Sequence, residues 1–270
     1  MTDRYAVMGN PIGHSKSPQI HSLFARQTGQ DLSYEAMLVP VDEFAAAVSH
    51  FCQQGGHGLN VTVPFKQQAW ELATQLSERA ERAGAVNTLT VNDGVLTGEN
   101  TDGVGLVRDL TNNHAVSLSG KQILLLGAGG AARGVIAPLI EQSPATMTLA
   151  NRTVSKAIEL ADQFSDLDII NGCGFSDLAG GVYDIIINAT AAGLSRQVPD
   201  LPAGVIKPGT VCYDMMYSQE PTAFMEYAHT QGAGKAVDGL GMLVEQAAES
   251  FYIWRGVRPE TAEVIKALRA

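Results

Sequence analysis

The residue spacing that points most directly to chemistry is a glycine-rich turn at residues 127–132. Gly127, Gly129 and Ala132 follow the apolar run 123–126 and fit the pattern G-x-G-x-x-G/A. In that pattern the first glycine permits a tight turn, the second lets the backbone approach a pyrophosphate, and the small third residue lets helix and strand pack closely. The N–H groups at the start of the next helix would face the phosphates. The sequence therefore predicts a dinucleotide site, and the alternative is a tight strand–helix turn without a ligand.

The end of the next strand, predicted at 146–150, indicates which dinucleotide is bound. Units that bind NAD usually carry an Asp or Glu at this tip, which holds the ribose hydroxyls. Here the strand is followed by Asn151, Arg152 and Thr153, with Lys156 close behind. A guanidinium and an ammonium suit a 2′-phosphate, whereas a carboxylate would repel it. We therefore expect NADP rather than NAD, and the alternative for Arg152 is an ordinary solvated arginine.

A first polar segment follows the strand predicted at residues 5–9. Ser15 and Ser17 lie in this segment, at the kind of strand end where ligands bind in open α/β sheets. Their hydroxyls could hydrogen-bond a polyol or a carboxylate. Ser17 could also cap the following helix, because Pro18 suits the first helical position. The two roles are compatible.

A second polar segment ends the strand predicted at residues 58–63. Asn60 and Thr62 are two residues apart on that strand and therefore point to the same face. Lys66 follows in the first turn of a helix, where the helix dipole disfavours a cation. A broken local rule often marks a functional position, so Lys66 is a candidate acid–base group. The alternative is a surface lysine with its charged end in solvent.

Asn87 and Asp102 form a third polar group. Asn87 begins a predicted strand, and Asp102 precedes Gly103 at the start of a helix that its side chain could cap. Alternatively, the Asp102 carboxylate faces a cleft at the domain junction, pairs with Lys66 and orients a substrate hydroxyl. The local sequence leaves both interpretations open.

Three further candidates are less specific. The segment 188–193 follows a strand and could lie along the cofactor. Tyr217 follows an apolar run, and Gln246 lies three residues after Leu243, where an apolar helix face would not require an amide. The six histidines show no metal-ligand spacing, so no metal site is predicted.

Composition excludes several classes of protein. A chain of 270 residues that is 45% hydrophobic and 17% charged suggests one large or two modest domains with a sizeable core. The net charge of −10 argues against a general nucleic-acid or anionic-membrane surface. The three scattered cysteines are typical of reduced thiols. No signal-peptide pattern or run of about 18–20 apolar residues occurs, so we expect a cytoplasmic protein with no nucleic-acid or membrane partner.

Alternating strand and helix patterns predict an α/β architecture with mostly parallel sheets. In the first half the expected strands are 5–9, 34–39, 58–63, 87–92 and 95–98, and the expected helices are 18–28, 41–53 and one from 64 that ends before 77. In the second half the expected strands are 123–126, 146–150, 168–170, 183–188, 210–214 and 234–237, followed by helices at 239–256 and 260–268. Asp93-Gly94 favours a tight hairpin between the last two strands of the first half.

Eight ordered segments carry a family resemblance over essentially the whole chain. They are NPIGHSKSP (10–18), GLNVTVPFK (58–66), GAVNTL (84–89), GENTDG (98–103), LLGAGGAARG (125–134), NRT (151–153), YDMMY (213–217) and DGLGMLVEQAA (238–248). With these segments the chain resembles the shikimate dehydrogenase family. The resemblance implies reversible reduction of 3-dehydroshikimate to shikimate with NADPH, in aromatic amino-acid biosynthesis. The sequence leaves the assembly open between monomer and homodimer.

The resemblance also assigns domains and residues. It implies an N-terminal α/β substrate domain with a mostly parallel sheet, made of residues 1–102 plus 239–270, and a Rossmann-type NADP-binding domain at 103–238. The implied substrate residues are Ser15, Ser17, Asn60, Thr62, Lys66, Asn87, Asp102, Tyr217 and Gln246, with Lys66 and Asp102 as the catalytic pair. The implied cofactor residues are Gly127, Ala128, Gly129, Gly130, Ala131, Ala132, Asn151, Arg152, Thr153, Lys156, Thr190, Met215, Gly239 and Met242.

Two departures and two alternatives accompany the resemblance. Segment 188–193 is NATAAG, where many relatives have hydroxyl residues, and segment 217–222 matches the family more loosely. The nearest alternative is a quinate/shikimate dehydrogenase with relaxed use of substrate and cofactor, although Arg152 argues against a strong NAD preference. A second alternative is a non-catalytic NADP or metabolite sensor on the same scaffold, against which Lys66 and Asp102 argue.

Overall fold

The computed structural model describes residues 2–190, 192 and 197–270. The chain divides into two compact units. Unit 1 comprises Met1–Leu106 and Leu243–Ala270, and unit 2 comprises Val107–Met242. The C-terminal segment therefore belongs to the same unit as the N-terminus. Each unit contains one six-stranded sheet.

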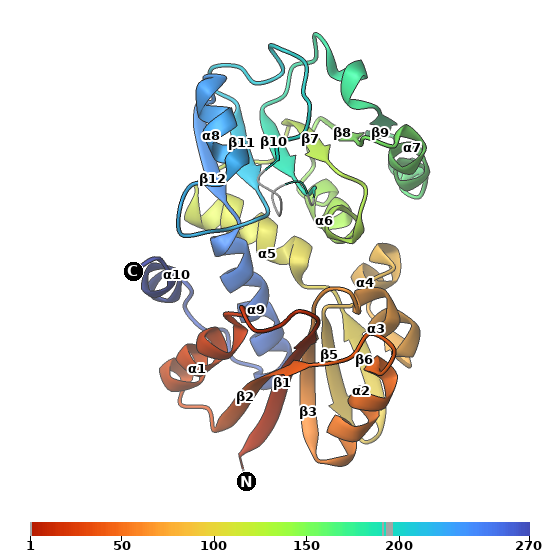
Figure 1. Cartoon of the computed structure of the whole chain (residues 1–270), viewed down its shortest axis with the longest axis vertical. Coiled ribbons are helices and arrows are strands. Elements are labelled where there is room, and N and C mark those ends of the chain that lie inside the picture. The colour runs from red at the N-terminus through yellow and green to blue at the C-terminus, as the bar shows by residue number, and fades with distance from the viewer. Residues whose placement is uncertain (1, 191, 193–196) are drawn as a thin grey trace. The chain divides into compact units, whose positions relative to one another are not determined.

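The sheet of unit 1 is mixed. Its strands are β1 (Asp3–Gly9), β2 (Leu32–Leu38), β3 (Gly56–Val61), β4 (Gln75–Leu76), β5 (Thr88–Asn92) and β6 (Val95–Glu99). Their order across the sheet is β2-β1-β3-β5-β6-β4, and all of these strands except β4 are labelled in Figure 1. β5 runs antiparallel to both of its neighbours, whereas the other three pairs are parallel. The β5–β6 hairpin accounts for one of these two antiparallel pairs, and in its turn Asp93 and Gly94 both adopt positive φ angles, of 47° and 79°.

The helices of unit 1, apart from α4, begin close to the positions that the sequence predicts. They are α1 (Ser17–Thr28), α2 (Phe44–Gln53), α3 (Lys66–Leu72), α4 (Glu78–Ala83) and α10 (Ala262–Arg269). Two more helices pass through the unit boundaries, namely α5 (Asp102–Arg108) and α9 (Leu240–Arg255). These two helices carry the chain out of unit 1 and back into it.

Two local expectations for unit 1 require correction. Ser17 is not an N-cap, because α1 begins at Ser17 itself and the Ser15 hydroxyl accepts a hydrogen bond from the Ser17 N–H at 3.3 Å. In addition, β4 and α4 were not predicted from the sequence. The signals for α4 were present: the Ser77 hydroxyl caps its first turn, and Gly84 ends it with a φ of 57°.

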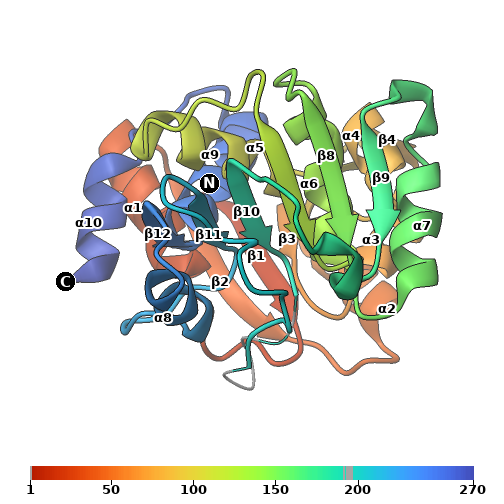
Figure 2. The same cartoon turned by 90° about the horizontal axis from the view of Figure 1, so that it is seen from above.

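The sheet of unit 2 is entirely parallel. Its strands are β7 (Gln122–Leu126), β8 (Thr146–Ala150), β9 (Ile170–Cys173), β10 (Ile185–Asn188), β11 (Val211–Asp214) and β12 (Lys235–Asp238). Their order is β12-β11-β10-β7-β8-β9, which Figures 1 and 2 show side by side. This is the doubly wound order of dinucleotide-binding sheets, and the direction of winding reverses between β7 and β10.

The helices of unit 2 connect these parallel strands. They are α6 (Gly130–Ile140), α7 (Val154–Asp162) and α8 (Ala223–Thr230). The side chains from Ile123 to Leu126 are fully buried, as expected for a strand covered on both faces. No helix of the described ranges is long and apolar enough to cross a membrane. The α/β fold with two mostly parallel sheets agrees with the prediction from the sequence.

Candidate active site

Lys66 and Asp102 form an ion pair in unit 1. The Lys66 Nζ lies 2.5 Å from Asp102 Oδ2, and both side chains are largely buried. Phe65, which is fully buried and stacked on Phe44 with ring centroids 4.8 Å apart, anchors the start of α3. Asn100 accepts a hydrogen bond from the Asp102 N–H at 3.1 Å and so fixes the start of α5. Of the interpretations left open by the sequence, the pairing of Lys66 with Asp102 is the correct one.

Asn87 holds the other oxygen of the Asp102 carboxylate. The Asn87 Nδ2 donates to Asp102 Oδ1 at 2.9 Å, and its Oδ1 accepts from the Thr101 N–H at the same distance. Both Asn87 and Thr101 are buried. The carboxylate is therefore held between a cation on one oxygen and an amide on the other, and its position is determined before any ligand binds.

Gln246, on α9, joins the same group of polar side chains. Its Oε1 accepts a hydrogen bond from the Thr101 hydroxyl at 3.3 Å and from Asn87 Nδ2 at 3.4 Å. Its Nε2 donates to the Leu243 carbonyl oxygen at 2.8 Å. The glutamine that is unexpected on an apolar helix face therefore has polar partners far away in the chain.

Asn60 extends the network towards the centre of the sheet. Its Nδ2 donates to the Asn87 carbonyl oxygen at 3.2 Å, to Thr88 Oγ1 at 3.1 Å and to Ser250 Oγ at 3.0 Å. Its Oδ1 accepts from the Tyr34 hydroxyl at 2.7 Å. Sequence reasoning did not identify Tyr34, Thr88 or Ser250. Only Ser250 had a signal, because it is a polar residue on the apolar side of α9.

A buried histidine packs against this network. The His21 ring stacks on Tyr34 with centroids 4.1 Å apart and an interplanar angle of 5°. Burial lowers the pKa of His21 to about 3. The imidazole is therefore neutral at physiological pH and packs as an aromatic ring. Burial also raises the pKa of Tyr34, while the nearby Ser17 hydroxyl lowers it.

The remaining predicted substrate residues divide between the two units. Ser15 and Thr62 are half-buried in unit 1, and Ser17 is buried beside Tyr34. Tyr217 belongs to unit 2, where it is half-buried and burial raises its pKa. The structure thus brings Asn60, Lys66, Asn87, Asp102 and Gln246 into one hydrogen-bonded network.

Unit 2 contains a hollow of about 1040 Å³ at the carboxyl ends of β7, β8, β9 and β10. The predicted cofactor residues that line it are Gly127, Ala128, Gly129, Gly130, Ala131, Asn151, Arg152 and Thr190. The predicted cofactor residues outside the lining are Ala132, Thr153, Lys156, Met215, Gly239 and Met242. The hollow is also lined by residues that were not predicted from the sequence, among them Gly174, Phe175, Ser176 and the segment 197–202. Position was the available signal, because residues 174–176 directly follow β9 at the same sheet edge.

The glycine-rich turn fits a pyrophosphate. Gly127 has a φ of +106°, and a Cβ there would lie 3.1 Å from the Ala189 carbonyl group. Gly129 and Gly130 have open space where a side chain would be, and α6 begins at Gly130 without a side-chain cap. The N–H groups of this helix start are therefore available for phosphate oxygens.

Backbone hydrogen bonds align three strand ends beside this hollow. The Met215 N–H donates to the Asn188 carbonyl oxygen at 3.0 Å, and the Gly239 N–H donates to the Met216 carbonyl oxygen at 2.9 Å. The predicted cofactor residues Met215 and Gly239 are thereby brought together. Residues 191 and 193 of the 188–193 loop lie outside the described residues.

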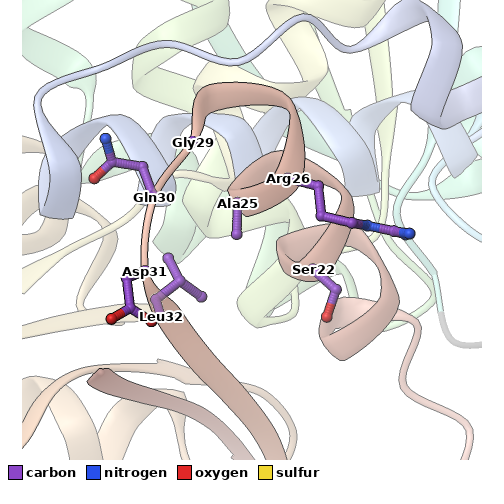
Figure 3. A pocket seen from close by; sticks show the side chains of 7 residues that line it. All are labelled: Ser22, Ala25, Arg26, Gly29, Gln30, Asp31 and Leu32. Carbon is purple, nitrogen blue, oxygen red and sulfur yellow. The ribbon is translucent and has the colours of Figure 1, made fainter. Parts of the chain in front are cut away.

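No metal centre is found among the described residues, and a second hollow contains no predicted site residue. Among the described residues no group of three or more His, Cys, Asp or Glu side chains could hold a metal ion. A second hollow, of about 430 Å³, lies between the end of α1 and the start of β2 (Figure 3). It is lined by Ser22, Ala25, Arg26, Gly29, Gln30, Asp31 and Leu32.

A doubly wound sheet with a glycine-rich turn, together with a second α/β unit that holds a lysine–aspartate pair, is typical of a two-domain dehydrogenase. Family models identify which one. Residues 7–89 match a model described as the shikimate dehydrogenase substrate binding domain. Residues 109–196 match shikimate / quinate 5-dehydrogenase, and residues 239–269 match the shikimate 5′-dehydrogenase C-terminal domain. The chain belongs to the shikimate dehydrogenase family.

Similar proteins cover the whole chain. The shikimate dehydrogenase (NADP(+)) of Alkalilimnicola ehrlichii is 57% identical over 269 residues, which cover 100% of this chain and 99% of the relative. The structure of an Ael1 enzyme from Pseudomonas putida is 45% identical with a TM-score of 0.96, covering 100% of this chain and 99% of that one. Shikimate 5-dehydrogenase from Thermus thermophilus, solved with NADP(H) and shikimate, is 32% identical with a TM-score of 0.89 and 99% coverage of both chains.

Proposed function

We propose that this protein catalyses the reversible NADPH-dependent reduction of 3-dehydroshikimate to shikimate, a step in aromatic amino-acid biosynthesis. The observation that carries this proposal is the Lys66–Asp102 pair, at 2.5 Å, within a network of amide and hydroxyl groups. The names of the similar proteins support the substrate and the cofactor. In this proposal unit 1 binds the substrate and unit 2 binds NADP(H).

Lys66 acts as the acid–base group. Bound NADPH supplies the hydride in the direction of reduction, so the protein must provide position and a proton. As the substrate carbonyl oxygen gains negative charge, the Lys66 ammonium donates a proton to it, and in oxidation the amine takes that proton back. Asp102 holds Lys66 through its Oδ2 and is itself held by Asn87 through its Oδ1. The pair can therefore keep its geometry while the proton moves.

The other proposed substrate residues recognise the carboxylate and hydroxyls of shikimate. They are Ser15, Ser17, Asn60, Thr62, Asn87, Tyr217 and Gln246. The amides of Asn60 and Gln246 already hydrogen-bond within unit 1, which limits how far they can turn when a ligand arrives. Such preorganisation lowers the cost of ordering the site.

In unit 2 the proposed cofactor contacts follow the order of the strands. The turn Gly127–Ala132 receives the pyrophosphate, and Asn151, Arg152, Thr153 and Lys156 receive the 2′-phosphate. Thr190, Met215, Gly239 and Met242 lie towards the nicotinamide. The hollow beside the glycine-rich turn and the exposed Arg152 at its edge support this arrangement.

A single assay tests the proposal. Purified protein is mixed with shikimate or quinate and with NADP⁺ or NAD⁺, and absorbance at the nicotinamide band is followed. We expect fast reduction with shikimate and NADP⁺ only. Comparable rates with quinate or NAD⁺ would favour the relaxed-specificity alternative. The match of residues 109–196 to shikimate / quinate 5-dehydrogenase is compatible with that alternative. Cofactor binding without any turnover would favour the sensor. The cytoplasmic location and the monomeric or homodimeric state stay predictions from the sequence.

A further inference from the structure

A buried pair of polar side chains, Asn188 and Asp214, lies at the carboxyl ends of β10 and β11. Both residues are at most 1% exposed. They are partners in register on the two strands, and the Asn188 Nδ2 donates to Asp214 Oδ1 at 3.1 Å. The acid–base chemistry proposed above uses neither of them. A polar pair buried this deeply is costly unless its hydrogen bonds serve the structure around it.

Each member of the pair holds the turn that follows its own strand. Asn188 Oδ1 accepts from the Thr190 N–H at 3.2 Å and from the Thr190 hydroxyl at 2.7 Å. Asp214 Oδ1 accepts from the Met216 N–H at 3.1 Å. One oxygen of Asp214 thus receives both the Asn188 amide and the turn after β11. The turn after β10 is therefore held by Asn188, the turn after β11 by Asp214, and the amide–carboxylate hydrogen bond links the two.

The environment of Asp214 contains neutral donors and a second carboxylate. Burial raises the pKa of Asp214, whereas the polar groups of Thr222, Met216 and Asn188 lower it and the Asp238 carboxylate raises it. Its Oδ2 makes no hydrogen bond to the described part of the chain. We therefore attribute the structural role of Asp214 to its oxygen Oδ1, which accepts both hydrogen bonds, and not to its negative charge.

The position of the pair in the sheet identifies which part of the cofactor it serves. In a doubly wound sheet each half binds one mononucleotide, on either side of the point where the strand order reverses. Here β7, β8 and β9 form the half with Arg152, the proposed 2′-phosphate residue, so they belong to the adenosine side. β10, β11 and β12 form the other half. Asn188 and Asp214 therefore lie on the nicotinamide side.

We infer that Asn188 and Asp214 are positioning residues that hold the two turns of the nicotinamide half of the dinucleotide site. The inference rests on the proposed function, because it assumes that the dinucleotide is the ligand of unit 2. It assigns no contact with the cofactor to either residue. They act through Thr190 and through the turn of residues 215–217.

Two nucleotide probes test this inference. NADP⁺ reports on both halves of the site, and adenosine 2′,5′-bisphosphate reports on the adenosine half alone. For Asp214→Ala we expect the Kd of NADP⁺ to rise about ten-fold, as after loss of buried hydrogen bonds, and the Kd of the bisphosphate to stay within about two-fold. Asp214→Asn keeps an accepting oxygen, so it should restore NADP⁺ binding. Equal weakening of both probes, or unchanged NADP⁺ binding by Asp214→Ala, would overturn the inference.

A matched control lies at the opposite edge of the same sheet. Asp184 precedes β10 and accepts a hydrogen bond from the Gln122 N–H at 2.9 Å, so Asp184→Ala also removes a carboxylate that holds backbone. We expect it to leave both dissociation constants within about two-fold. If Asp214→Ala does not fold, Asn188→Ala removes the same link from the other strand and should show the same selective loss. If both single variants fold, the double variant should bind NADP⁺ no more weakly than either of them.

The binding assay separates this inference from the proposed function. If the wild-type protein binds NADP⁺ but does not oxidise shikimate, the proposed reaction is wrong, and the selectivity of the variants still decides the inference. If the wild-type protein binds neither probe, both are wrong. If it oxidises shikimate while Asp214→Ala loses both probes equally, only the inference fails.

Discussion

The two units place carboxylates at strand-end sites in opposite ways. In unit 1 Asp102 faces a cation, Lys66, and the pair is linked to side chains from several segments of the chain. In unit 2 Asp214 faces an amide and a backbone N–H, and beside the hollow the glycine-rich turn leaves backbone N–H groups available. In the proposed function, unit 1 supplies charged side chains for chemistry, whereas unit 2 supplies backbone N–H groups for binding.

Removal of the Lys66 side chain is expected to have the largest effect, because it removes the cation from the candidate site of unit 1. For Lys66→Ala we expect kcat to fall by about 10³-fold, because general acid–base catalysis by one group contributes about 10²- to 10⁴-fold. The KM for shikimate should change by less than about three-fold, since the other polar groups of the site remain. Steady-state kinetics in the direction of shikimate oxidation measures both quantities.

Gln67→Ala is the control for this variant, because Gln67 is the next residue on α3 and its side chain is exposed. It should leave kcat unchanged. A Lys66→Ala enzyme with nearly normal turnover would exclude lysine as the acid–base group and would leave the ion pair a structural one.

Removal of the Arg152 side chain tests the proposed cofactor site of unit 2. For Arg152→Ala we expect the KM for NADP⁺ to rise about 10- to 100-fold, because a hydrogen-bonded charge pair with the 2′-phosphate is lost. The KM for NAD⁺, which has no 2′-phosphate, should hardly change. Lys121→Ala, which removes an exposed cation from the start of β7, is the control. Equal effects on both cofactors would contradict a 2′-phosphate role for Arg152.

Loss of a single hydroxyl would sharpen the comparison within unit 1. Thr101→Val keeps the side-chain shape but removes the group that bridges Asn87 and Gln246. We expect the KM for shikimate to rise about five-fold, because the two amides lose a shared partner whose net value is about 1 kcal/mol. Thr101→Ser should restore the KM. A loss of thermal stability without a change in KM would show that the hydroxyl serves folding alone.

The smallest effect concerns pH and the buried histidine. The folded-state pKa of His21 is about 3, below its ordinary value of 6.5, so the unfolded chain takes up a proton first as pH falls. Stability from this group is complete above pH 6.5 and is lost progressively down to about pH 3. Between pH 7 and pH 5.5 we expect the free energy of unfolding to fall by about 1 kcal/mol from this residue.

Urea unfolding at both pH values measures this difference. His21→Phe, which keeps an aromatic ring beside Tyr34, should reduce the pH dependence by that amount. An unchanged dependence in the variant would show that other groups control acid sensitivity.

Prediction from sequence succeeded best where the signal was local. The β5–β6 hairpin follows from Asp93-Gly94, and the strand and helix around Gly127 follow from consecutive residues, so these elements appear where they were expected. Prediction was weaker where short elements depend on packing. The two residues of β4 are ordered by pairing with β6, and no periodic pattern in such a short segment could indicate a strand.

For the candidate site, the sequence indicated side chains, but of their contacts it indicated only the pairing of Lys66 with Asp102, as one of two possibilities. Asp102 had two possible roles, because a helix cap and an ion pair place the same residue type at the same position. Tyr34, Thr88 and Ser250 were missed since they are ordinary residues of strands and helices until the sheet order brings them beside Asn60. Their role exists only in the folded network.

By itself the sequence determined the glycine-rich turn, the basic tip after β8 and the alternation of strands and helices, because backbone conformation and local charge depend on consecutive residues. Only the tertiary structure decided that Asp102 pairs with Lys66, that Gln246 joins Thr101 across 145 positions of sequence, and that Asn188 meets Asp214. Those contacts depend on strand order and register, which follow from the burial of the whole core rather than from any one segment.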